Sequence, residues 1–144
     1  MGFGITGFMR FAIAILSGSS GASRPAPASP RAGSKWILAP VVSWGPGDDA
    51  RVARLAALVP GAVRAPLLDV PGLAHLAAGA RLFVAGDTGP LHLADALGAR
   101  TVALFGPTDP ERNGPYRYRN GVVRDMRSVS DDTVLEIASR VVAG

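Results

Sequence analysis

Cysteine is absent from the 144 residues of this chain. The chain can therefore form no disulfide, no thiolate nucleophile and no cysteine-ligated zinc site. Aromatic residues make up only 6% and charged residues 18%, whereas hydrophobic residues make up 48%. This balance excludes a highly charged disordered chain and is typical of one globular domain of ordinary size with its own core.

Residues 1–47 contain no Asp or Glu, and the first acidic residue of the chain is Asp48. The apolar run "FAIAIL" (residues 11–16) faintly resembles part of a signal peptide, but it is far too short to span a bilayer. A tract rich in Pro, Ser, Ala and Gly (residues 17–34) follows it and is typical of a flexible linker. We therefore expect residues 1–35 to be an unassigned, disordered leader and residues 36–144 to hold the folded domain.

Lysine is nearly absent too: Lys35 is the single one, and arginine carries the rest of the formal net charge of +4. A basic balance permits binding to nucleic acid or to an anionic membrane. Five arginines and two tyrosines do gather in one segment, namely Arg112, Tyr116, Arg117, Tyr118, Arg119, Arg124 and Arg127. Anion ligands beside a nucleotide loop explain this segment as well, and it contains no recognised nucleic-acid motif. We expect no nucleic-acid partner.

From residue 36 onward, apolar runs alternate with segments of helical periodicity. The runs predict strands at 37–44, 62–68, 81–85, 101–105 and 121–125. The periodic segments predict helices at 48–59, 70–79, 90–98 and 130–142. Strands that alternate with helices favour an α/β fold with a parallel sheet.

The segment "GDTGP" (residues 86–90) joins a predicted strand to a predicted helix, and ligands of α/β proteins gather at such carboxyl ends of strands. Thr88 can cap the helix, and Gly89 allows close backbone approach. The helix N-terminus then offers free N–H groups to an anion such as a pyrophosphate, with His92 as a further donor. Asp87 would repel phosphate, so it is better suited to accept from sugar hydroxyls or to hold a metal. Spacing alone also fits a mere capping turn, and both interpretations stay open.

Two further loops repeat this pattern at the ends of other predicted strands. In "FGPTDPERNGPY" (residues 105–116), Thr108 and Arg112 are candidates to contact phosphate. In "WGPGDD" (residues 44–49), Asp48 is a candidate to accept from ribose hydroxyls. A ligand lying across several strand-end loops would explain why all are rich in Gly, Pro and Asp.

The linked motifs "DTGPLHLADALG" and "TVALFGPTDP", preceded by "VVSWGPGDDARVARLA" and "GLAHLAAGARLFVAGDTG", resemble glycosyltransferase family 9, the lipopolysaccharide heptosyltransferases. The resemblance covers about residues 41–142. It implies the C-terminal half of a GT-B fold, Rossmann-like, which binds a nucleotide sugar, typically ADP-heptose. The implied acceptor is an inner-core lipopolysaccharide sugar, and the implied reaction is inverting and needs neither metal nor cofactor.

The resemblance also implies roles for individual residues. Asp87 would contact the transferred sugar, and the pyrophosphate would be held by Thr88, Gly89 and His92. Gly47 or Asp48 would meet the ribose. "SKW" (residues 34–36) is similar to the family's phosphate-binding Lys followed by Trp, which makes Lys35 a further candidate.

The family's acceptor domain, with its acidic catalytic base, has no counterpart in this sequence, and residues 1–35 match nothing in the family. We therefore expect a donor-binding half that does not catalyse transfer by itself. The alternative is a non-catalytic nucleotide-binding module that pairs with another chain. The resemblance places the protein in the bacterial cytoplasm, with a peripheral position at the inner membrane as an option.

Overall fold

The computed structural model describes residues 12–17 and 38–144. The strands are β1 Ala12–Ser17, β2 Leu38–Ser43, β3 Val63–Arg64, β4 Leu82–Gly86, β5 Thr101–Leu104 and β6 Val122–Val123. The helices are α1 Asp49–Leu58, α2 Val70–Ala78, α3 Gly89–Ala96, α4 Pro110–Asn113 and α5 Asp131–Ala143, with a short 3-10 turn η1 at Arg119–Gly121. Every strand and helix predicted from residue 36 onward is present, and α4, η1 and the strand β1 were not predicted.

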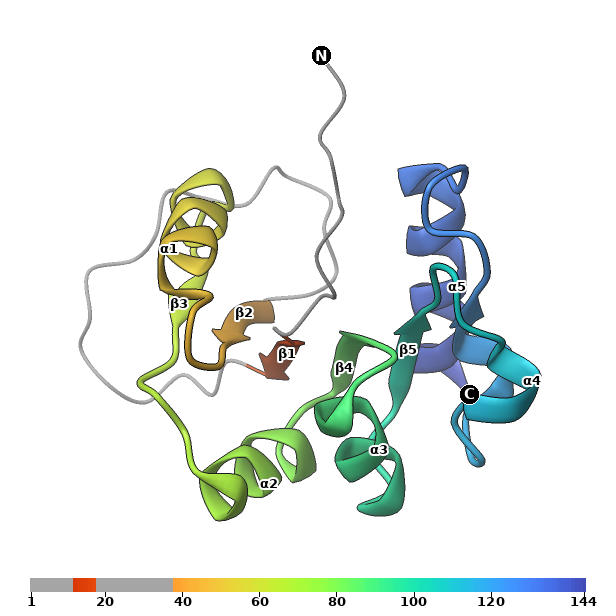
Figure 1. Cartoon of the computed structure of the whole chain (residues 1–144), viewed down its shortest axis with the longest axis horizontal. Helices are drawn as coiled ribbons and strands as arrows, with labels where there is room; N and C mark the ends of the chain where they lie inside the picture. The colour runs from red at the N-terminus through yellow and green to blue at the C-terminus, as the bar shows by residue number, and fades with distance from the viewer. Residues whose placement is uncertain (1–11, 18–37) are drawn as a thin grey trace.

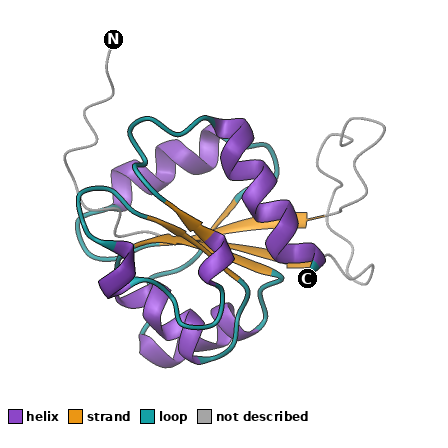
Figure 2. Cartoon of the chain, turned by 90° about the vertical axis from the view of Figure 1, so that its right-hand side faces the viewer, coloured by secondary structure: helices purple, strands orange, loops and turns teal. Residues whose placement is uncertain are grey.

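The strands form one six-stranded sheet in the order β3-β2-β1-β4-β5-β6 (Figure 1). Helices cover both faces of this sheet (Figure 2). This order is that of a Rossmann-type sheet, in which the chain winds outward from the centre in both directions. The predicted α/β, Rossmann-like class is therefore confirmed.

Each face of the sheet has its own hydrophobic core, because side chains along a strand alternate between the two faces. Phe83 and Ala85 of β4 face α2 and α3, in a cluster that also contains Leu91. Leu82 faces the opposite side, where Ile137 of α5 packs. The 10-residue helix α1 packs on β2 and β3, on the same side as α5 (Figure 1).

The strand β1 corrects the prediction for the N-terminal segment. Residues 12–17, which we expected in a disordered leader, lie at the centre of the sheet between β2 and β4. Ala12 and Ala14 are fully buried there. The other residues of the predicted leader lie outside the described residues.

The strand β1 also corrects the expectation of a parallel sheet. The pairs β2–β3, β4–β5 and β5–β6 are parallel, but β1 is antiparallel to both of its neighbours. Because β2 and β4 both oppose β1, they run in the same direction as each other. Five parallel strands thus end at one edge of the sheet, and the loops that follow them meet there.

Candidate functional site

The register of the sheet brings the three predicted loops to one edge. Ala12 pairs with both Ser43 and Ala85, so β2 and β4 end at the same level. These strands are two strand spacings apart, roughly 10 Å. Gly86 pairs with Leu104 on β5, so the loop after β5 starts beside the corner after β4. The loops after β2, β4 and β5 therefore surround one stretch of the sheet edge.

Thr88 lies at the N-cap position of α3, in extended conformation, but it does not cap the helix with its side chain. Its Oγ1 instead donates to the carbonyl of Gly86 at 3.2 Å. The prediction of a Thr88 cap is therefore wrong for the side chain. As a result, no side chain caps the first turn of α3 in the described part of the chain, and its positive end is left for another acceptor.

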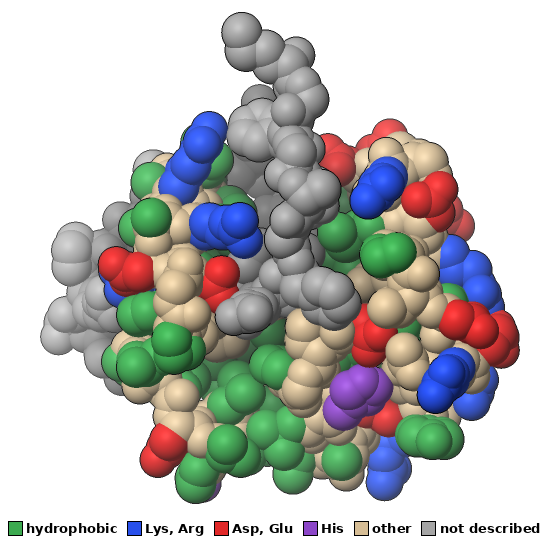
Figure 3. All heavy atoms as spheres, in the orientation of Figure 1, with side chains coloured by type: hydrophobic (Ala, Val, Ile, Leu, Met, Phe, Trp, Pro, Cys, Tyr) green, Lys and Arg blue, Asp and Glu red, His purple; other side chains and the backbone are tan. Residues whose placement is uncertain are grey.

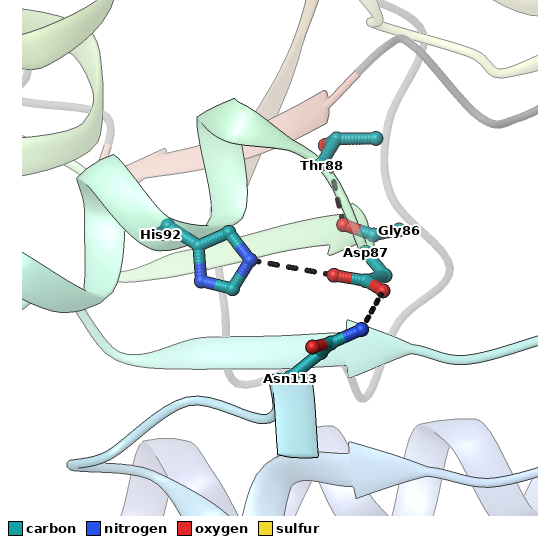
Figure 4. A network of polar contacts seen from close by, with 5 residues as sticks. All are labelled: Gly86, Asp87, Thr88, His92 and Asn113. Carbon is teal, nitrogen blue, oxygen red and sulfur yellow. Dashed lines mark hydrogen bonds and ion pairs between the residues drawn. The ribbon is translucent and has the colours of Figure 1, made fainter. Parts of the chain in front are cut away.

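Asp87 is the centre of the polar contacts at this corner (Figure 4). Its Oδ1 lies 3.3 Å from Nε2 of His92, one turn into α3. Its Oδ2 accepts from Nδ2 of Asn113, at the end of α4, at 3.1 Å. The side chain of Asp87 is only 14% exposed, whereas that of His92 is 50% exposed. The predicted pair Asp87 and His92 is thus brought together, with His92 open to a ligand.

Glycines face open space in all three loops. A Cβ added at Gly47, Gly89 or Gly106 would meet no described atom within 4 Å. Gly47 also has a φ of +90°, which favours glycine at that turn. Packing within the described chain therefore does not require glycine at position 89 or 106, and the space beside them is available to a ligand.

Asp48 lies in the loop after β2, immediately before α1. It is only 4% exposed, and its Oδ2 has no hydrogen-bond partner among residues 12–17 and 38–144. Its Oδ1 is 3.9 Å from Nη1 of Arg51, a distance that is too long for a hydrogen bond. A buried carboxylate oxygen without a partner is unfavourable, so it is suited to accept a hydroxyl from a ligand.

The loop after β5 contains Thr108, which is partly buried, and Arg112, which is exposed. Neither side chain has a hydrogen-bond or ion-pair partner within the described ranges, and no contact joins them to Asp87. The residue of this loop that does reach the corner is Asn113, which was not predicted. Lys35 lies outside the described residues.

The arginine-rich segment is partly neutralised by its neighbours. Glu111 forms ion pairs with Arg124 and, at 3.9 Å, with Arg119. Acidic and basic side chains are interspersed on the side of the molecule that carries α4 and α5 (Figure 3). On the face that Figure 3 shows, the arginines therefore do not form a patch of one sign of charge.

The described residues form neither a membrane-spanning helix nor a cluster of metal ligands. No helix there is long and apolar enough to cross a membrane. No group of three or more His, Asp or Glu side chains in this part of the chain lies close enough together to hold a metal ion.

The strand order and the loops at the carboxyl edge define a doubly wound α/β domain of the Rossmann type, in which the central strand β1 is antiparallel to its neighbours. The family model of glycosyltransferase family 9 (heptosyltransferase) matches residues 38–136. The chain therefore belongs to glycosyltransferase family 9, as its linked motifs predicted.

Relatives and a solved structure support this assignment. The chain is 47% identical over 74 residues to lipopolysaccharide heptosyltransferase 1 of Pseudomonas aeruginosa, a match that covers 51% of this chain and 21% of the relative. It is 35% identical over 98 residues to the enzyme of the same name from Escherichia coli K12, covering 65% and 31% of the two chains. The solved structure of E. coli heptosyltransferase WaaC with ADP superposes with a TM-score of 0.61 at 27% identity, over 69% of this chain and 32% of that one. The chain thus matches about a fifth to a third of the length of these relatives.

Proposed function

We propose that this chain is the donor-binding half of a heptosyltransferase, and that it binds a nucleotide-activated sugar, ADP-heptose. One observation carries the proposal: the carboxylate of Asp87 is held between His92 and Asn113 beside the first turn of α3, which no described side chain caps. The solved relative contains ADP, which supports the adenine nucleotide as the donor.

The pyrophosphate of the donor would lie at the N-terminus of α3. Pro90 has no N–H, and the N–H of Leu91 donates to the carbonyl of Thr88 at 3.0 Å, so this turn offers an anion the N–H of Gly89 and the positive end of the helix dipole. Gly89 faces open space, so a phosphate can approach the backbone closely. The half-exposed imidazole of His92 can donate to a phosphate oxygen from the same helix.

The sugars of the donor would be recognised by carboxylates. Asp87 accepts hydrogen bonds and repels phosphate, so the heptose hydroxyls are its suitable partners. The unpartnered Oδ2 of Asp48 would accept from the ribose, on the loop after β2. The two carboxylates lie on loops that start about 10 Å apart, on either side of the pyrophosphate position.

In the proposed reaction, an acceptor hydroxyl of the lipopolysaccharide inner core attacks the anomeric carbon of the heptose. The bond from that carbon to the pyrophosphate breaks, ADP leaves, and the configuration inverts. The hydroxyl proton goes to a base, which we expect in an acceptor domain outside the matched region; such a base typically contributes roughly 10²–10⁴-fold. A cytoplasmic location beside the inner membrane, where this acceptor is anchored, belongs to the same proposal.

Calorimetric titration of the chain with ADP, UDP and GDP tests the proposal. We expect ADP to bind more tightly than UDP or GDP, and His92→Ala to weaken ADP binding about 10-fold, the effect of a hydrogen bond to a charged group. His75→Ala is the matched control, because His75 is an exposed histidine on α2 whose Nδ1 lies 2.8 Å from the carbonyl oxygen of Pro71. No ADP binding, or equal loss in both variants, would contradict the proposed site.

A further inference from the structure

The loop after β5 is anchored to the C-terminal part of α3. Asp95, near the end of α3, is 5% exposed. Its Oδ2 accepts from the backbone N–H of Tyr116 at 2.8 Å, and its Oδ1 accepts from that of Arg117 at 3.2 Å. A carboxylate that accepts two N–H groups in a buried position forms strong, charge-assisted hydrogen bonds. The anchor therefore fixes the C-terminal end of this loop.

The residues between this anchor and α4 have little freedom. Pro115 is fully buried, and its ring limits φ. Gly114 lies so close to α4 that a Cβ there would be 2.3 Å from the carbonyl oxygen of Pro110. Its own N–H donates to that oxygen at 2.8 Å. The position of Asn113, the preceding residue, is thereby set from the Asp95 anchor through two tightly packed residues, Gly114 and Pro115.

Asn113 meets Asp87 with a defined chemistry. An ionised carboxylate only accepts hydrogen bonds, so the amide nitrogen of Asn113, rather than its oxygen, must face Asp87. That nitrogen holds Oδ2 at 3.1 Å, while Oδ1 faces His92 at 3.3 Å. The two contacts come from α4 and α3, so they fix the plane of the Asp87 carboxylate from two sides (Figure 4).

We propose that Asn113 is a positioning residue for the donor sugar, and that Asp95 holds it in place through the loop. This inference rests on the proposed function, because it requires Asp87 to accept hydrogen bonds from the donor sugar. Asn113 directs Oδ2 away from the ligand and leaves Oδ1 to accept from a hydroxyl of the heptose. The loop after β5 then acts on the sugar through Asp87. This loop takes no part in binding the pyrophosphate.

Binding of ADP-heptose and of ADP to Asn113→Ala separates this role from a structural one. We expect the Kd of ADP-heptose to rise about 5- to 10-fold, as for the loss of one hydrogen bond to a charged group, and that of ADP less than about 2-fold. Tyr116→Ala is the matched control: it removes a side chain that is 83% exposed, keeps the N–H that Asp95 binds, and should leave both values unchanged. An equal rise for both ligands in Asn113→Ala, or no rise, would overturn the inference.

Amide hydrogen exchange without ligand tests the anchor. We expect the N–H groups of Tyr116 and Arg117 to exchange at least about 10-fold faster in Asp95→Ala, and unchanged in Asn113→Ala. Should Asp95→Ala fail to fold, Asp95→Asn keeps one acceptor oxygen and should release one of the two N–H groups. Unaltered protection in the Asp95 variants would overturn the anchor.

The two experiments also separate this inference from the proposed function. If the unaltered chain binds ADP but Asn113→Ala does not distinguish the ligands, the inference alone fails. If the unaltered chain binds neither ligand, the proposed function fails, and with it the role of Asn113 toward the sugar.

Discussion

At the scale of single residues, the glycines of this chain fall into two kinds. Gly89 faces open space at the first turn of α3, where a side chain would meet no described atom. Gly121 lies against the sheet, where a Cβ would be 2.1 Å from the carbonyl oxygen of Thr101. Glycine at position 121 is thus required by packing, whereas packing within the described chain does not require it at position 89, where we propose that the pyrophosphate approaches.

This difference predicts that substitution by alanine affects stability at position 121 and ADP binding at position 89. Gly121→Ala should lower the free energy of unfolding by about 2 kcal/mol or more, because backbone must move to admit the methyl group. Gly89→Ala should change it by less than about 0.5 kcal/mol, because nothing lies in the way. Gly89→Ala should nevertheless weaken ADP binding. Urea denaturation and calorimetry measure the two quantities, and a destabilised Gly89→Ala with unimpaired ADP binding would contradict this account.

The sequence allowed the local contacts of the site to be predicted, but not the distant ones. Asp87 and His92 are five residues apart across a strand-to-helix turn, so their spacing alone places them at one corner. Asn113 is 26 residues from Asp87, and its contact depends on where α4 and the Asp95 anchor place it. The Thr88 cap was wrong because its hydroxyl has a competing acceptor, the carbonyl of Gly86.

At the scale of elements, helices and strands with strong local signals were predicted within a few residues. The helix α5 begins after Ser130, whose Oγ accepts from the N–H of Thr133 at 3.2 Å. A serine directly before an amphipathic segment favours an N-cap, and the helix predicted at 130–142 begins at this residue. The helix α4 has only four residues and therefore shows no periodicity that a sequence pattern could reveal.

The cap of α5 has a measurable effect on stability. Ser130→Ala should lower the free energy of unfolding by about 1 kcal/mol, because it removes the acceptor for an N–H of the first turn. Ser139→Ala in the same helix is the control, since Ser139 is exposed and alanine is the better helix former. Thermal or urea unfolding measures the stability of both variants. Equal stability of Ser130→Ala and Ser139→Ala would mean that the cap contributes nothing.

At the scale of the whole molecule, the central strand β1 was the largest departure from expectation. Its six residues follow a basic residue and precede a Pro- and Ser-rich tract, so the local pattern favoured a leader. Its place in the sheet depends on pairing with β2 and with β4, whose first residue is Leu82. Such long-range pairing leaves little trace in the strand itself. Its central position joins the two halves of the sheet that carry the site.

The burial of β1 predicts that a charge there unfolds the domain. Ala14→Asp should lower the free energy of unfolding by about 3 kcal/mol or more, since Ala14 is fully buried in a cluster of apolar side chains. Ala50→Asp, in the exposed first turn of α1, should change stability by less than about 0.5 kcal/mol. Urea denaturation compares the two variants. Equal stability would show that β1 is not part of the sheet in solution.

The central claim is that the strand-end loops after β2 and β4 bind the nucleotide of the donor, with its pyrophosphate at the N-terminus of α3. Adding ADP to the isotope-labelled chain and following its backbone amide signals by NMR tests this claim most directly. The account predicts the largest shifts at Gly89 and His92, with smaller ones at Gly47 and Asp48 and none at Ser139 on α5. Shifts confined to other surfaces, or none at saturating ADP, would contradict the claim.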